Sequence, residues 1–220
     1  PMHPCHHFRI HLWDSEKAER ALASAARCGQ GSPGIAHMWH MPGHIYSKLK
    51  RYHDSAWQQE ASARVDHAHM MRDRVLPDQI SNFAHNNEWL TRNLNHLGRA
   101  NDAAALARNM VELPRHPKYN TLAKPDAPTE YGKRGSARYG RMRLLETLLR
   151  YEMWDEIIRA SQTVYLEPTT IPEEQAKRLA AVGTAHYALG QAEKGAEILA
   201  NLDELNQRIE DMKLEAEAKA

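Results

Sequence analysis

The stretch HMWHMPGHIY, residues 37–46, brings three histidines into eight positions: His37, His40 and His44. Neutral imidazole suits Zn, Cu, Ni and Fe(II), and two histidines spaced i and i+4 can chelate one ion from one helix face. His40 and His44 have this spacing. We therefore expect a divalent transition metal there, with further ligands from the rest of the candidate set: His37, His6, His85 and Glu88.

The geometry of a helix supports this grouping. A helix turns about 100° per residue, so the three histidines of this stretch share one narrow stripe. The opposite face carries Trp39, Gly43 and Tyr46. Pro42 opens an alternative, because a proline inside a helix removes a hydrogen bond and clashes with the preceding turn. If the helix begins near Pro42 instead, only His44 lies within it, and the helical stripe no longer includes His37 and His40.

The elements around these residues are predicted to be helices. Ala, Leu, Glu, Arg and Gln fill amphipathic segments such as NDAAALARNMVEL, whereas alternating β patterns are scarce. Short punctuators such as GQGSPG, LGRAND and ALGQAE separate the segments. The pattern predicts an all-α fold and a single helical-repeat domain with units at about 2–34, 36–75, 84–113, 138–167 and 174–203, followed by a charged C-terminal helix or tail at 204–220.

A period of 34 residues is also visible. Trp39, Gly43 and Tyr46 have the spacing of the tetratricopeptide-repeat (TPR) signature. The stretches FRIHLWD, HMPGHIY and HNNEWL resemble a bacterial group of TPR proteins whose function is uncharacterised. The resemblance implies a TPR-like right-handed superhelix of about five antiparallel helix pairs. The chain departs from the group at Lys50, where the turn usually carries glycine.

In such an array the histidine stripe is expected to face the inner groove. One period back, His3 and His6 are the equivalents of His37 and His40. In the third unit, the stripe residues are His85, Glu88 and Arg92. First helices of neighbouring units lie about 10 Å apart, so their side chains can converge on one ion.

Three other interpretations stay open. The groove could hold a peptide or carboxylate ligand without metal, since TPR grooves commonly bind peptide segments; the candidate contacts are Asn86, Arg92, Asn95, Tyr46 and Lys48. A metal, or a histidine beside Asp66 or Glu88, could serve catalysis, but no substrate or catalytic residue is indicated and an enzyme is not favoured. The histidines could also only hydrogen-bond to one another, and His7 and His11, a second i, i+4 pair on another face, could be packing residues.

Composition excludes several classes of protein. The net charge of +1 gives no field for nucleic acid, and no apolar run reaches the roughly 18 residues of a membrane span. Cys5 and Cys28 are too few for a disulfide scaffold; they could form one disulfide, Cys5 could bind a soft metal, or both could be buried thiols. The start at Pro1 indicates a fragment of a longer protein, so the compartment is not assigned. The proline-rich connector 114–135 could be a lid or a mobile loop.

Overall fold

The computed structural model describes residues 3–80, 82–116 and 135–218. Within these ranges every regular element is helical, with ten α-helices and two short 3-10 helices. The prediction of an all-α fold with about five helix pairs is confirmed. The chain divides into two compact units, Pro1–Arg143 and Leu144–Ala220. None of the described helices combines the length and apolar character that crossing a membrane requires.

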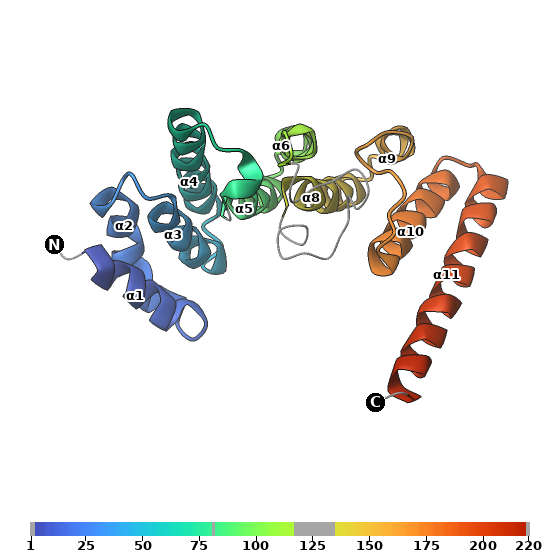
Figure 1. Ribbon diagram of the computed structural model, residues 1–220, viewed down its shortest axis with the longest axis horizontal. Coiled ribbons are helices and arrows are strands. Elements are labelled where there is room, and N and C mark those ends of the chain that lie inside the picture. The colour runs from blue at the N-terminus through green and yellow to red at the C-terminus, as the bar shows by residue number, and fades with distance from the viewer. Residues whose placement is uncertain (1–2, 81, 117–134, 219–220) are drawn as a thin grey trace. The chain divides into compact units, whose positions relative to one another are not determined.

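The first unit begins with three helix pairs (Figure 1). Their bounds are α1 His3–Asp14 with α2 Leu22–Gly31, α3 Ala36–Lys48 with α4 Tyr52–Asp73, and α5 Phe83–His96 with α6 Ala100–Glu112. The 3-10 helices are Ala18–Ala21, before α2, and Pro77–Gln79, before α5.

The remaining helices are α8 Ser136–Arg150, α9 Trp154–Ser161, α10 Pro172–Ala188 and α11 Ala192–Ala218. The boundary between the two units falls inside α8. Helix α11 runs without a break through the residues predicted as the end of the last unit and as a separate tail.

Four of the pairs share one turn. Two positions after the first helix ends, the backbone enters the left-handed region, at Lys50 (φ 57°), Gly98 (75°), Glu152 (52°) and Gly190 (73°). The next N–H then bonds to the carbonyl five residues back, as in the Schellman motif; Arg51 N lies 2.8 Å from Tyr46 O. Lys50 therefore occupies a position that favours glycine.

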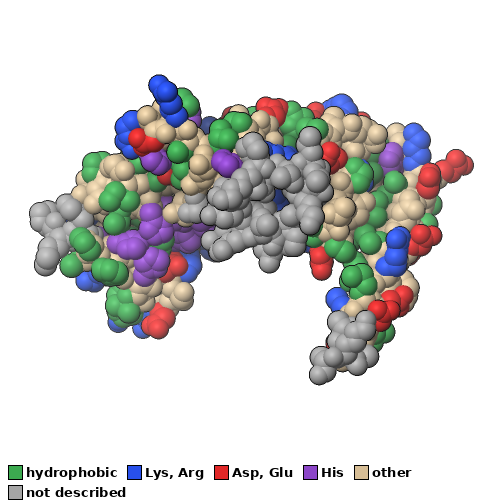
Figure 2. Space-filling view, in the orientation of Figure 1, with side chains coloured by type: hydrophobic (Ala, Val, Ile, Leu, Met, Phe, Trp, Pro, Cys, Tyr) green, Lys and Arg blue, Asp and Glu red, His purple; other side chains and the backbone are tan. Residues whose placement is uncertain are grey.

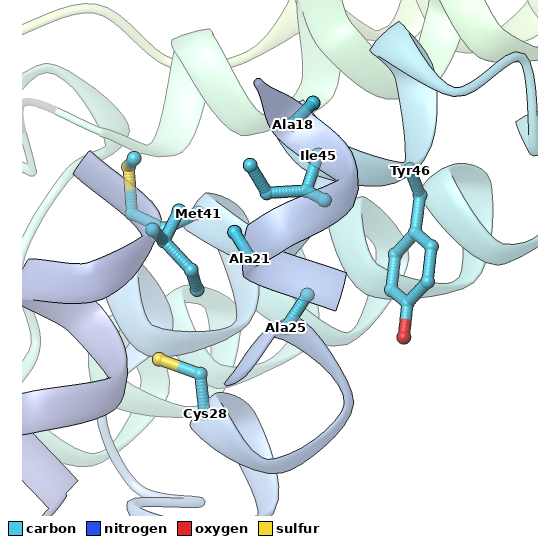
Figure 3. Close-up of a cluster of buried hydrophobic side chains, with 8 residues drawn as sticks. Ala18, Ala21, Ala25, Cys28, Met41, Ile45 and Tyr46 are labelled. Atoms are coloured by element: carbon cyan, nitrogen blue, oxygen red, sulfur yellow. The ribbon is translucent and has the colours of Figure 1, made fainter. Parts of the chain in front are cut away.

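In the core of the first pairs, small side chains before and within α2 meet larger side chains of α3. Ala21, Ala25 and Cys28 pack against Met41 and Ile45 of α3 (Figure 3). These small side chains let α2 and α3 approach closely. Both cysteines are free thiols, Cys5 exposed and Cys28 buried, so the expected alternative of a disulfide between them is wrong. Burial raises the pKa of the Cys28 thiol to about 11.

Helix α3 is continuous through Pro42, so the alternative in which it begins at Pro42 is wrong. Three fully buried side chains of α4, at i, i+4 and i+7 on one face, donate to carbonyls of α3. The bonds are Ser55 Oγ to Gly43 O (2.8 Å), Gln59 Nε2 to His40 O (3.2 Å) and Ser62 Oγ to Ala36 O (2.7 Å). Helix α4 therefore holds α3, and the histidines on α3, in a fixed position.

Candidate functional site

Six histidines from α1, α3 and α5 gather on the first unit in two adjoining groups. The inner triad is His40, His44 and His85, and the outer triad is His7, His11 and His37; within each triad, one ligand atom per residue lies within 4.8 Å of the others. The rings of His37 and His40, 5.9 Å apart, connect the groups. We call the six residues the histidine face, and Figure 2 shows a patch of histidine side chains over α1 and α3.

His40 is the most buried member, with 2% of its surface exposed. Gln59 Nε2 donates to the His40 carbonyl, and Gln59 Oε1 lies 2.7 Å from His40 Nδ1. Because Oε1 can only accept, Nδ1 carries the proton and Nε2 keeps its lone pair. His44 Nε2 lies 2.7 Å from that nitrogen and donates to it. The lone pair of His40 Nε2 is therefore aimed at His44, a second member of the inner triad.

His85 is oriented by a buried carboxylate. Its Nδ1 lies 3.1 Å from Glu88 Oε1, and the second oxygen of Glu88 accepts from Arg143 Nε at 2.8 Å. Burial by itself would raise the pKa of Glu88, but the hydrogen bond from His85 and the charge of Arg143 outweigh it, and the pKa is lowered. A carboxylate behind a histidine is the usual partner of a metal-binding imidazole. The structure therefore places Glu88, a predicted ligand, as the residue that holds His85.

The environment keeps the rings of His40 and His44 neutral. Burial, followed by the neighbouring rings, lowers the pKa of His40 to about 2. Burial also lowers the pKa of His44 to about 4, against the opposing effect of Asp14. A neutral ring has a free lone pair at neutral pH, as a metal ligand requires.

Aromatic and cationic side chains border the inner triad. The Trp89 ring centroid lies 4.2 Å from that of His44, and the Arg92 guanidinium lies 4.9 Å from the Trp89 centroid. The ring centroid of Tyr139, in α8, lies 6.3 Å from that of His85. Arg92, a predicted ligand-binding residue, is thus half-buried beside the triad.

Other predicted residues lie elsewhere. His6 is in neither triad, and its Nδ1 lies 3.3 Å from Ser24 Oγ. Asn86, Asn95 and Tyr46 lie in the interior, at 0%, 1% and 6% exposure. Tyr46 belongs to the apolar core with Met41 and Ile45, so its ring is not available to a ligand at the surface.

Asn86 Nδ2 bonds to Asp66 Oδ2 at 2.7 Å, and burial raises the pKa of Asp66 to about 6. Asp66 therefore pairs with Asn86. The predicted lid at 114–135 lies, from 117 to 134, outside the described residues.

Some site residues escaped sequence reasoning. The grouping of His7 and His11 with His37 was not predicted, although their i, i+4 spacing signals a possible chelating pair. His11 is exposed and His7 half-buried, which argues against a purely packing role. Gln59 and Arg143 carry no local signal, since each acts through a contact that is distant in sequence.

Comparison with known proteins identifies the fold. No protein-family model matches the sequence, and no curated protein matches it significantly. The crystal structure of YrrB, described as a TPR protein with an unusual peptide-binding site, matches with a TM-score of 0.54 and 19% identity, over 96% of this chain and 88% of that chain. The fold is that of a TPR protein. At this identity the likeness shows the TPR fold alone.

Proposed function

We propose that the protein is a TPR-type binding module that recognises a peptide segment of another protein on its histidine face. The observation that carries this proposal is the presentation of histidines by three consecutive first helices, α1, α3 and α5, on one face. The shared TPR fold supports it, since YrrB is described as having a peptide-binding site.

The side chains on and beside the histidine face indicate which peptide groups would bind there. Neutral imidazoles donate and accept hydrogen bonds, as the peptide backbone requires, and the Trp89 ring offers an apolar surface. Lys48 is already paired with Asp14, at 3.0 Å from its Oδ1. Arg92 is therefore the cation that pairs with a carboxylate of the peptide.

Selection from a random peptide library tests the proposal, with untagged protein in the presence of a chelator. The selected peptides are synthesised and their dissociation constants measured by calorimetry. We expect Arg92→Ala and His44→Ala to weaken binding about tenfold, whereas His67→Ala, at an exposed position on α4, leaves it unchanged. Failure to enrich any peptide, or equal binding by all variants, would refute the proposal.

A second candidate function is transition-metal binding by the inner triad, and one specific observation favours it. Three donors lie within 4.8 Å, and two of the rings are oriented by partners of the kind found behind metal ligands, Gln59 and Glu88. Three histidines with a fourth position open are a common arrangement for zinc.

Elemental analysis of untagged protein purified without chelator tests this candidate. We expect the inner triad to hold one equivalent of metal, lost in the His40→Ala/His44→Ala double variant. The His6→Ala variant is the control, because His6 belongs to neither triad. A wild-type protein without metal that also fails to take up added Zn²⁺ would exclude the candidate.

A further inference from the structure

The outer triad joins two helices that are separate in sequence. His7 and His11 lie one turn apart on α1, with ring centroids 4.6 Å apart, and His37 comes from the start of α3. The His37 centroid lies 5.0 Å from that of His7 and 6.2 Å from that of His11. Three imidazoles from two helices therefore share one small volume.

The donor atoms are close to the spacing that a metal requires. His7 Nε2 and His11 Nε2 lie 3.1 Å apart, whereas two nitrogens bound to one tetrahedral Zn²⁺ lie about 3.3 Å apart, from Zn–N bonds of about 2.0–2.1 Å. The pair can therefore chelate an ion with a movement of a few tenths of an ångström.

One ring nitrogen of His37 has no hydrogen-bond partner among the described residues. Its Nδ1 is screened from solvent and makes no hydrogen bond to any part of the chain that the structure describes. Burial, then the nearby His7 and His11, lowers the pKa of His37, which keeps the ring neutral. A buried polar nitrogen without a partner is energetically costly. An ion bound by His7 and His11 would give His37 a partner, because His37 would become its third ligand.

The donor set and its exposure define the ion. No carboxylate belongs to the outer triad, so Ca²⁺ and Mg²⁺ do not fit, whereas three imidazoles suit Zn²⁺, Ni²⁺ and Cu²⁺. His11 is exposed, so an ion can enter directly from solvent. We infer that the outer triad is a transition-metal site separate from the inner triad, and that the ion fastens α1 to α3.

The fastening matters because α1 has few buried contacts. Ile10 is fully buried, but Phe8 and Leu12 are 67% and 65% exposed. A metal that bridges α1 and α3 adds a bond where few apolar side chains are buried. Local unfolding of α1 should therefore be rarer in the metal-bound protein.

Titration of untagged protein with Zn²⁺ tests the inference, with stoichiometry from calorimetry and hydrogen exchange of residues 3–14 followed by mass spectrometry. We expect Zn²⁺ to slow exchange in α1 at least tenfold in the wild type and in the His40→Ala/His44→Ala variant. The effect should disappear in His7→Ala/His11→Ala and in the milder His7→Gln/His11→Gln, and persist in His6→Ala, the control on the same helix.

The outcomes separate the two triads. If the inner site fails, the wild type binds one equivalent, which the outer variants lose, and the inference stands. If the outer variants bind as many equivalents as the wild type, or if Zn²⁺ leaves exchange in α1 unchanged, the inference is wrong. Circular dichroism of the metal-free variants verifies that the substitutions at His7 and His11 leave the fold intact.

Discussion

Gly43 on α3 is the position where a single methyl group should disturb the inner triad. A Cβ built there would lie 2.2 Å from Gln59 Nε2 and 2.9 Å from Gln59 Cδ. Gln59 is fully buried on α4 and makes both of its hydrogen bonds to His40. Gly43→Ala must therefore push Gln59 away and leave His40 Nδ1 without its acceptor.

The expected cost follows from opposing effects. Replacing glycine by alanine inside a helix normally stabilises by about 1 kcal/mol. Overpacking costs about 1–3 kcal/mol, and a buried group that loses its hydrogen-bond partner costs about 1–3 kcal/mol. We expect Gly43→Ala to lower the free energy of unfolding by about 3 kcal/mol, opposite in sign to its helix propensity.

A double-mutant cycle in urea, followed by circular dichroism, measures the effect. Gln59→Ala makes room for the methyl group, so Gly43→Ala should cost less than about 1 kcal/mol in that background. Gly34→Ala is the control, since nothing lies within 4 Å of the Cβ there. A Gly43→Ala protein as stable as the wild type, or strictly additive effects in the cycle, would refute the reasoning.

Three further predictions concern the first unit, each measured by urea unfolding. Lys50→Gly should stabilise by about 1 kcal/mol because it relieves a left-handed residue, and Gly98→Ala should do the reverse; an unchanged midpoint would contradict this. Asp66, whose pKa is raised to about 6 from 3.8, keeps its proton longer when folded, so stability should fall as pH rises from 4 to 6; a slope that persists in Asp66→Asn would contradict this. Glu88→Gln should cost about 2–4 kcal/mol because Arg143 loses its buried carboxylate; a neutral effect would contradict it.

The helix pairs were predictable because they depend on local signals. The amphipathic period and the short Gly-containing segments between helices specify where helices form. The common face of His37, His40 and His44 on α3 follows from helix geometry alone. Lys50 shows the same principle, since the resemblance expects glycine at the position where the backbone is left-handed. Such features need no knowledge of distant contacts.

The division of the histidines into two triads was not predictable in this way. The period of 34 residues made His6 the equivalent of His40, but α1 and α2 are joined through the 3-10 helix Ala18–Ala21 rather than the turn shared by the later pairs. The register of the other pairs therefore does not transfer to α1, and His7 and His11 meet His37 instead.

The residues that orient His40 and His85 could not be predicted for another reason, which is their distance along the sequence. Gln59 and Arg143 lie 19 and 55 residues from the side chains that they contact, His40 and Glu88. The burial of α5 could not be predicted either, because its sequence is polar. Three of its buried polar residues bond back to carbonyls of α5 four residues earlier, from Asn87 to Phe83, Thr91 to Asn87 and Asn93 to Trp89. A polar sequence can therefore form a buried helix.

The two candidate ligands of the inner triad use the same surface, which leads to a last prediction. A metal would take the lone pair of His40 Nε2, which now accepts the hydrogen bond from His44, whereas a peptide would bond to His44 at the same surface. Zn²⁺ should therefore weaken binding of a selected peptide at least tenfold, and calorimetry with and without Zn²⁺ measures this. The weakening should disappear in His40→Ala/His44→Ala if that variant still binds the peptide elsewhere on the face. An equal affinity with and without Zn²⁺ in the wild type would mean that the peptide does not contact the inner triad.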